Sequence, residues 1–332
     1  MNFLLSIVTL FVLHTAFAQT DSLTYAEKLG FPKGAKVIIL HVDDVGMSYE
    51  SNQGAITAMT TGIANSCSVM MPCSWVPGFV HYLKAHPGMD AGLHLTLTSE
   101  WYDYRWGPLS GKSKVPGLVD KEGALWSNVA DVVTHATADE VEIEIRAQIE
   151  RARAMGFEPT HLDSHMGTLF AVPAFIERYV KVGIEYKIPV MFIGGHATNI
   201  ASETNRSAAE MNYMRSIALQ LWNAGLPVLD DLNGNSYDWA LPKNIKPTAE
   251  NLRKYKTQQY INMLKAMKPG LTMVIMHCTK TTEVFPAISN SGDIRLGDLL
   301  AMTDPVLKAY IQKEKIILTT WKELMERRKR VK

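Results

Sequence analysis

The sequence predicts an α/β fold, namely a (β/α) barrel of seven or eight parallel strands that is TIM-like or a distorted form of that barrel. Strand-like and helix-like segments alternate along the chain, which favours a parallel sheet with helical crossovers. Several strands also end in histidine or aspartate, and barrel enzymes carry their chemistry at the carboxyl ends of the strands. The alternative, a doubly wound sheet, is disfavoured because no glycine-rich phosphate loop follows the first strand.

The length and composition of the chain are those of a globular protein. It has 332 residues, of which 47% are hydrophobic and 20% charged. Because no linker or repeat interrupts the sequence, we expect residues 19–332 to form a single catalytic domain. The 34 lysines and arginines balance 33 acidic residues, so the chain has no broad basic field for nucleic acid. The basic residues 327–332 are expected to form a solvated tail.

The first 18 residues have the pattern of a signal peptide. An apolar run at residues 3–13 is shorter than a membrane span, and Ala16-Phe17-Ala18 provides a small-residue cleavage pattern. We therefore expect cleavage after Ala18 and export to the periplasm or the exterior; an uncleaved anchor is the alternative. No later stretch is long and apolar enough to span a membrane, so no stable membrane insertion is expected after cleavage. The oligomeric state is left open.

The first half of the chain gives clear element boundaries. An apolar run at residues 37–45 predicts a buried strand. It is followed by helix 51–62, strand 63–71, helix 77–86 and strand 92–98. The stretch 101–123 contains four glycines and two prolines and is too long for a simple connection. Its aromatic residues Trp101, Tyr104 and Trp106 are candidates for sugar stacking, although loop tryptophans often only pack the loop down.

The second half continues the alternation. Thr137 caps a helix whose apolar residues recur at helical spacing until Gly156 ends it. The following elements are strand 161–165, helix 175–187, strand 189–193, helix 208–224, strand 227–231, helix 249–267, strand 272–277, helix 304–314 and strand 316–320. Polar loops are expected at residues 233–248 and from the 272–277 strand to about residue 293.

The strand ends carry the residues of a candidate metal site. The first strand ends in Asp43 and Asp44, and adjacent side chains on a strand point in different directions. One carboxylate could therefore bind a cation while the other takes a proton. His94 lies on the polar face of its strand, which would face the lumen of a barrel. In the 161–165 strand, two histidines and an aspartate share one face, namely His161, Asp163 and His165.

One aspartate and two histidines around a cation match a catalytic divalent site that keeps a position open for water. Oxygen and nitrogen ligands without thiolate favour zinc, with manganese, cobalt and magnesium as alternatives. A second acid must protonate the leaving group, and His277 at the end of its strand is the candidate. Each histidine taken alone could equally be a hydrogen-bonded core residue, so the prediction rests on their combination.

Residues 41–48, 92–98 and 161–165 resemble, in order and spacing, the three successive motifs of YdjC-like carbohydrate deacetylases, which are related to polysaccharide deacetylases. The resemblance implies a metal-dependent hydrolase that removes N-acetyl groups from a sugar or oligosaccharide. It implies that the metal ligands are Asp44, His94 and His165, the base Asp43 and the acid His277. His161, Asp163 and His41 are expected to surround the ligands or contact the substrate. The chain departs from the family pattern at Gly167, where many members have a further histidine.

Two other functions fit the same residues. The first is another metal-dependent hydrolase on the same barrel, such as a phosphodiesterase or an esterase, because the fold and the ligands do not fix the bond that is cleaved. The second is a noncatalytic carbohydrate-binding protein.

The three cysteines, Cys67, Cys73 and Cys278, do not make a disulfide framework, and we expect buried free thiols.

Overall fold

The computed structural model describes residues 23–200 and 207–331, so the predicted signal peptide lies outside the described residues. The sheet has the strand order β4-β3-β2-β1-β6-β5, and β7 also pairs with β1. All of these pairings are parallel. The strands are β1 (Lys36–Val45), β2 (Ser66–Val69), β3 (Ala91–Leu95), β4 (Leu162–Ser164), β5 (Asp231–Asn233), β6 (Gly270–Met276) and β7 (Ile317–Leu318).

The sheet curls until its two outer strands are joined. Leu162 of β4 forms a parallel bridge with Val190, and Ile193 forms another with Leu229, just before β5. The predicted strands 189–193 and 227–231 therefore complete the ring largely through single bridges. The backbone N–H groups of Gly194 and Gly195 both donate to the carbonyl of Leu229, which ends the pairing there. These contacts confirm the predicted barrel in its distorted form and exclude the doubly wound alternative.

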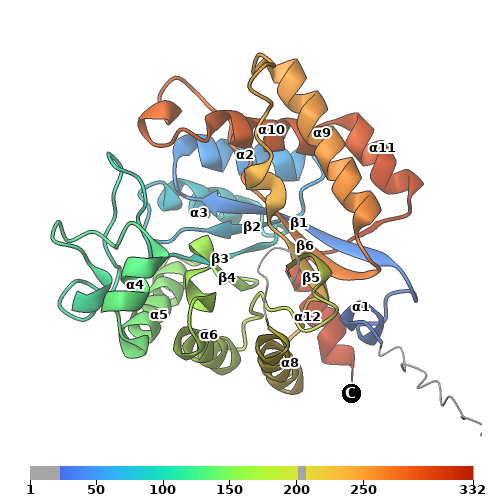
Figure 1. The fold of residues 1–332 in the computed structure, drawn as a ribbon. Coiled ribbons are helices and arrows are strands. Elements are labelled where there is room, and N and C mark those ends of the chain that lie inside the picture. Colours follow the sequence, from blue (N-terminus) through green and yellow to red (C-terminus); the bar gives the residue numbers. More distant parts are fainter. Residues whose placement is uncertain (1–22, 201–206, 332) are drawn as a thin grey trace, which may run out of the picture.

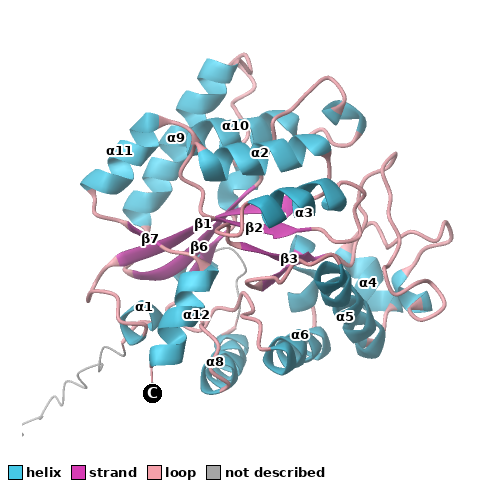
Figure 2. Ribbon diagram, turned by 180° about the vertical axis from the view of Figure 1, so that it is seen from behind, coloured by secondary structure: helices cyan, strands magenta, loops and turns pink. Residues whose placement is uncertain are grey.

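Helices surround the sheet, as Figure 1 and the reverse view in Figure 2 show. The α-helices are α1 (Tyr25–Lys28), α2 (Tyr49–Thr60), α3 (Val76–Ala85), α4 (Val129–His135), α5 (Ala138–Ala154), α6 (Pro173–Tyr186), α8 (Ala208–Asn223), α9 (Ala249–Ala266), α10 (Gly292–Met302), α11 (Pro305–Lys313) and α12 (Trp321–Arg330). Short 3₁₀ turns are η1 (Pro116–Leu118), η2 (His165–Phe170), η3 (Asn235–Asp238) and η4 (Phe285–Ala287).

The structure corrects several of the predicted elements. Residues 327–330, which were expected to lie in a solvated tail, belong to α12, and Arg328 is buried. Helix α10 fills residues to which the sequence assigned no element, and α4 was not predicted either. Predicted strand 92–98 ends earlier, because the N–H of Thr96 donates to Gln148 Oε1 of α5 instead of to a neighbouring strand. The α5 helix begins at the predicted cap, where Thr137 and Glu140 hydrogen-bond reciprocally.

Two apolar clusters stabilise the fold. The larger one lies between the sheet and the helices, and the smaller one gathers residues on the inner face of the strands. The smaller cluster includes Val37 and Ile39 of β1 and Leu271 and Met273 of β6. Because side chains alternate along a strand, His41 and Asp43 lie on the same face as Val37 and Ile39, nearer the carboxyl end. The polar site therefore stands on an apolar floor.

All three cysteines lie in the described part of the chain and are buried, free thiols, as the sequence predicts. Within residues 23–200 and 207–331, no helix has both the length and the apolar character needed to cross a membrane.

Candidate active site

A bulge at the end of β1 presents both aspartates to the site. Val42 pairs with Cys67 and Val45 with Val69, so three steps on β1 match two on β2. Asp44 has φ 62°, a left-handed conformation that is rare for residues other than glycine. Regular alternation would send the two carboxylates to opposite faces, as the strand pattern predicts. That prediction is wrong, because the bulge turns both carboxylates to the same side. His94 Nε2 lies 3.7 Å from Asp43 Oδ2 and 3.4 Å from Asp44 Oδ1.

The residue after the strand allows the chain to turn away sharply. Gly46 has φ 88°, and its N–H donates to Asn52 Oδ1 of α2 at 2.8 Å. A Cβ at this position would lie 2.7 Å from Val76 Cγ2, so only glycine fits without movement. This turn starts α2, whose cap Ser48 accepts a hydrogen bond from the Ser51 N–H.

Asp44, His94 and His165 are placed so that they could hold one cation. Asp44 Oδ1 lies 3.4 Å from His94 Nε2 and 3.3 Å from His165 Nδ1. This oxygen is buried and accepts no hydrogen bond from the described residues. A buried carboxylate oxygen with no donor costs free energy, and two ring nitrogens face the same point. One oxygen and two nitrogens fit zinc or a similar divalent cation.

The other nitrogen of each imidazole is already bound. His94 Nδ1 lies 2.6 Å from Asp163 Oδ1, and His165 Nε2 lies 3.1 Å from both oxygens of Glu100. Carboxylates in these positions orient the ring and select the nitrogen that is left for a metal. The sequence placed Asp163 beside the ligands, but it carried no signal for Glu100, which lies in a loop beyond β3.

Arg295 on α10 holds the second oxygen of Asp44. Its Nη2 lies 2.8 Å from Asp44 Oδ2, and its Nε donates to Ser291 Oγ at 2.7 Å. Burial alone would raise the pKa of Asp44, but the Arg295 guanidinium together with His165 and His277 outweighs burial and holds that pKa well below its usual range. Asp44 therefore stays ionised with Oδ1 turned to the imidazoles. Sequence reasoning missed Arg295 because its helix was missed.

The site has an excess of negative charge. Four carboxylates, those of Asp43, Asp44, Glu100 and Asp163, contact its imidazoles, whereas Arg295 supplies one permanent positive charge. Burial alone would lower the pKa of His165, but Glu100 and Asp44 raise it to about 10. The same field that retains a proton on this ring favours a cation between the ligands.

Asp43 is positioned by groups beneath it. Its Oδ1 lies 3.2 Å from His41 Nε2 and accepts a hydrogen bond from Ser68 Oγ at 3.4 Å. Burial alone would lower the pKa of His41, but hydrogen bonds to Asp163 and Asp43 raise it to about 9. The protonated imidazole therefore pairs with Asp43 at the floor of the cleft.

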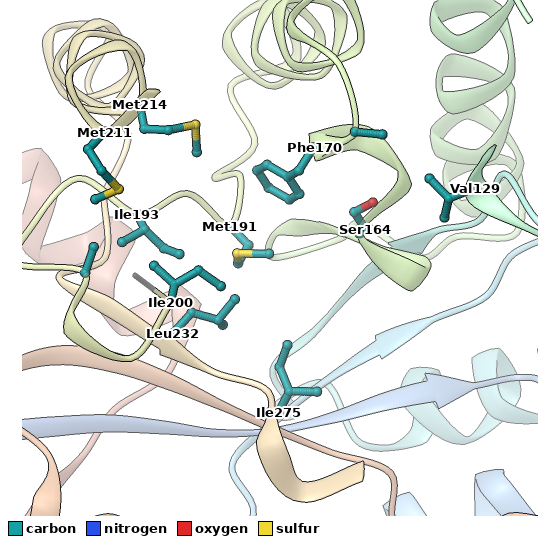
Figure 3. Close-up of a pocket in the computed structure, with 13 residues that line it drawn as sticks. Val129, Ser164, Phe170, Met191, Ile193, Ile200, Met211, Met214, Leu232 and Ile275 are labelled. Carbon is teal, nitrogen blue, oxygen red and sulfur yellow. The ribbon is translucent and has the colours of Figure 1, made fainter. Parts of the chain in front are cut away.

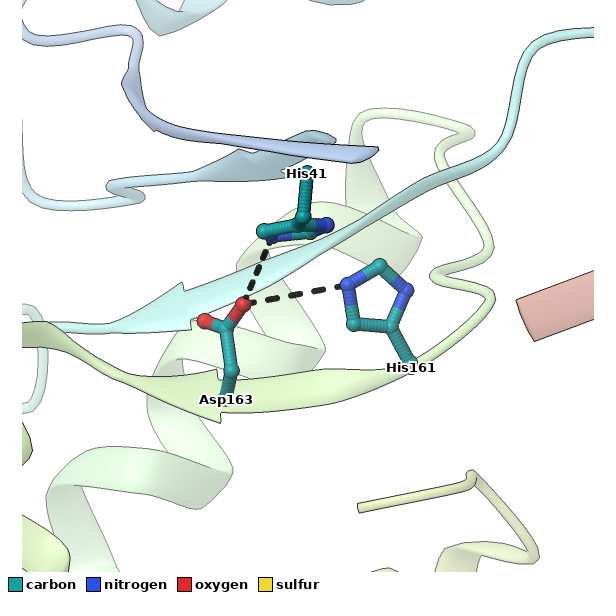
Figure 4. A group of neighbouring side chains, drawn as sticks. All are labelled: His41, His161 and Asp163. Atoms are coloured by element: carbon teal, nitrogen blue, oxygen red, sulfur yellow. Dashed lines mark ion pairs between the residues drawn. The ribbon is translucent and has the colours of Figure 1, made fainter. Parts of the chain in front are cut away.

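His41, His161 and Asp163 also lie close together, as Figure 4 shows. His41 Nδ1 lies 2.9 Å from Ser66 Oγ, and its Nε2 lies 2.9 Å from Asp163 Oδ2, so neither nitrogen is open to a metal. The His161 ring stacks on Trp321 with centroids 5.1 Å apart, and burial lowers its pKa. This group lies beneath the site, where His41 links Asp163 to Asp43.

His277 reaches the cleft from the end of β6. Its Nε2 lies 3.9 Å from Asp44 Oδ2, and its ring meets Tyr237 edge to face with centroids 4.9 Å apart. Burial lowers the pKa of His277, despite the nearby carboxylates. Its backbone N–H donates to Asp298 Oδ2 at 3.1 Å, which fixes the end of the strand. The structure thus brings all five predicted catalytic and ligand residues to one cleft.

The three loop aromatics take different positions. Trp101 lines the cleft beside Glu100. Trp106 is buried and donates its Nε1–H to the Thr98 carbonyl, and Tyr104 donates its hydroxyl to the Met47 carbonyl. Trp101 packs against both rings, with centroids 6.4 Å from Tyr104 and 5.4 Å from Trp106. Tyr104 and Trp106 therefore support the loop, and Trp101 is the one of the three at the cleft.

We expect Arg295→Met to weaken zinc binding by about 10- to 100-fold, because Asp44 would lose the partner that orients it. The loss is measured by competition with a chromophoric chelator. Arg295→Lys is the matched control, and it should weaken binding less because it keeps the charge but not the planar fork of donors. A folded Arg295→Met protein with unchanged zinc affinity would contradict this role.

The fold and the site together define a class of protein, a parallel-strand barrel with an Asp-His-His group that could hold a cation at the carboxyl ends of its strands. A family model described as YdjC-like protein matches residues 37–313. The chain therefore belongs to the YdjC-like protein family.

The chain is also similar to individual proteins that are named as deacetylases. A carbohydrate deacetylase of Thermus thermophilus is 38% identical over 163 residues, which are 49% of this chain and 55% of that protein. A carbohydrate deacetylase of Thermoanaerobacter pseudethanolicus is 24% identical over 286 residues, 86% of this chain and 98% of that protein. A chitooligosaccharide deacetylase of Serratia marcescens is 30% identical over 133 residues, 39% and 49% of the two chains. The matches to the Thermus and Serratia proteins thus span about half of each.

The fold also has a close counterpart among solved structures. A crystal structure of a protein from Enterococcus faecalis superposes with a TM-score of 0.68 at 20% identity, covering 87% of this chain and 99% of that one. At this level of identity, the likeness shows a shared fold.

Proposed function

We propose that the protein is a metal-dependent carbohydrate deacetylase that hydrolyses the N-acetyl group of an acetylated sugar or oligosaccharide. The observation that carries the proposal is the buried Asp44 Oδ1, which lacks a hydrogen-bond donor among the described residues and faces ring nitrogens of His94 and His165. The names of related proteins, carbohydrate deacetylase and chitooligosaccharide deacetylase, supply the reaction. Zinc is the metal that this ligand set favours.

Asp43 and His277 carry out the two proton transfers of the reaction. Asp44, His94 and His165 would hold a divalent cation, which would supply a Lewis acid for the acetyl carbonyl and lower the pKa of the attacking water toward neutral. Asp43 takes the proton from the attacking water, because its carboxylate lines the cleft and is held in place by His41. Protonated His277 gives a proton to the leaving nitrogen as the C–N bond breaks. Because burial lowers the pKa of this ring, the ring must first take up that proton from Asp43 or from solvent. The products are acetate and the free amino sugar.

Trp101 offers a place for the sugar itself. Its ring lies at the cleft, and aromatic faces stack on the apolar faces of sugar rings. Arg295 also lines the cleft, and its Nη1 has no hydrogen-bond partner among the described residues, so it can donate to a substrate oxygen. Export through the residue 1–18 signal peptide would give the enzyme access to saccharides outside the cytoplasm.

The proposal is tested by measuring acetate release from a panel of N-acetylated mono- and oligosaccharides with the zinc-loaded protein. We expect acetate in parallel with new amino groups, and no phosphate from phosphodiester substrates. His94→Ala should abolish acetate release, with Thr168→Ser as a matched control variant outside the ligand set. Phosphate release without acetate would favour the phosphodiesterase alternative and contradict the proposal.

A further inference from the structure

A second cavity lies beside the active site, with a volume of about 370 Å³. It is formed where the barrel closes through single bridges, between η2, the 190–200 segment, α8 and β5 (Figure 3). Its walls include six large apolar side chains, those of Phe170, Met191, Ile193, Met211, Met214 and Leu232. This volume lies in the range of small-molecule sites in proteins.

The described residues that line the cavity offer no free polar side chain to a ligand. Among the described residues that line it, Ser164 is the only one with a polar side chain, and its Oγ accepts a hydrogen bond from the Leu169 N–H at 3.0 Å. No charged side chain is among them. A polar occupant would lose its hydrogen bonds to water without replacement, whereas an apolar occupant gains by leaving water.

The cavity adjoins the catalytic cleft. Ser164, Gly167 and Ile275 line both. Ser164 directly precedes the ligand His165, and Ile275 lies two residues before His277 on the same face of the chain. A sugar held over Asp44 therefore has the apolar cavity as its immediate neighbour.

We infer that the natural substrate carries an alkyl chain next to the acetylated sugar, and that this chain occupies the cavity. The inference rests on the proposed deacetylase function and names its substrate class as an acetylated glycolipid or alkyl glycoside. A flexible chain fits better than a rigid ring, because three of the walls are methionines, whose unbranched side chains adapt to a variable occupant.

The test compares octyl with methyl N-acetyl-β-glucosaminide, each below any micelle-forming concentration, with the zinc-loaded protein. Each buried methylene strengthens binding roughly fourfold, so burial of only three of the seven additional carbons would give octyl on the order of a 60-fold higher kcat/KM for acetate release. Binding of both glycosides is measured in parallel by calorimetry, where octyl should bind more tightly and with a more negative heat-capacity change.

Two cavity variants test whether the alkyl chain of the substrate lies in the cavity. Met211→Lys places a charge in the cavity wall and should remove most of the octyl preference while leaving the methyl glycoside unaffected; Met211→Leu is the matched control and should keep the preference. Ala171→Trp, at an exposed position of the cavity rim, should lower the preference without disturbing the core.

The outcomes separate the two proposals. Equal hydrolysis and equal binding of the two glycosides would overturn the alkyl-chain inference and leave the deacetylase function standing. Preferential binding of octyl without acetate release from either would support the cavity assignment and contradict the deacetylase function. An octyl preference that survives in both Met211→Lys and Ala171→Trp would also overturn the inference.

Discussion

The Asp43→Asn protein is expected to keep its metal and lose turnover by about 10²- to 10⁴-fold, because general base catalysis supplies a rate factor of that size. Asp43 Oδ2 lies farther from His94 Nε2, at 3.7 Å, than the Asp44 oxygen does, and Asp43 Oδ1 is engaged by His41. The amide would preserve the shape of the site but could not take the proton.

The Asp44→Asn protein is expected to lose both metal and turnover. The amide lacks the charge that pairs with Arg295 at 2.8 Å and with the cation. The loss of metal affinity should exceed the roughly 10- to 100-fold that follows removal of a residue behind a ligand. Metal content by elemental analysis and acetate release, measured on both variants, separate the roles. A metal-free Asp43→Asn protein, or an Asp44→Asn protein with full metal, would reverse the assignment.

The largest effect on stability is expected from Asp298→Ala, which should lower the free energy of unfolding by about 3–5 kcal/mol. Asp298 is fully buried and accepts from Lys256 Nζ at 2.9 Å and from the Tyr260 hydroxyl at 2.8 Å. Its other oxygen accepts the His277 N–H. Removing the carboxylate leaves the ammonium group of Lys256 buried without its counter-charge and releases the strand end that carries His277.

Denaturant unfolding with linear extrapolation measures this cost. The matched control is the double variant Lys256→Met with Asp298→Leu, which removes both charges and replaces them with apolar side chains. It should recover much of the stability, because a buried ion pair contributes little more than well-packed apolar residues. A cost below about 1 kcal/mol for Asp298→Ala would show that the pair is not desolvated as the structure describes.

Much of the site could be predicted because its residues lie at strand ends. In a parallel barrel the carboxyl ends of all strands meet at one rim, so Asp44, His94 and His165 converge once their strands are recognised. The apolar residues recur at the spacings of strands and helices in turn, and this alternation indicated the barrel. The side-chain face shared by His161, Asp163 and His165 also follows from the period of a strand.

The rest of the site depends on tertiary contacts that no local pattern carries. Arg295 reaches Asp44 from a helix far along the chain, and Glu100 reaches His165 from a loop. The bulge that turns both aspartates inward requires the φ of 62° at Asp44, which the sequence alone does not indicate for an aspartate. Trp101 and Trp106 are tryptophans of the same loop, and the sequence does not distinguish them. Tertiary packing buries Trp106 and leaves Trp101 at the cleft.

The most direct test of the central claim is acetate release by the same protein preparation before metal removal, after exhaustive chelation and dialysis, and after return of zinc. If Asp44, His94 and His165 hold the metal that drives deacetylation, activity on N-acetylglucosamine oligomers should fall to background and return with one equivalent of zinc per chain. Undiminished acetate release from protein shown by elemental analysis to be free of metal would contradict the account.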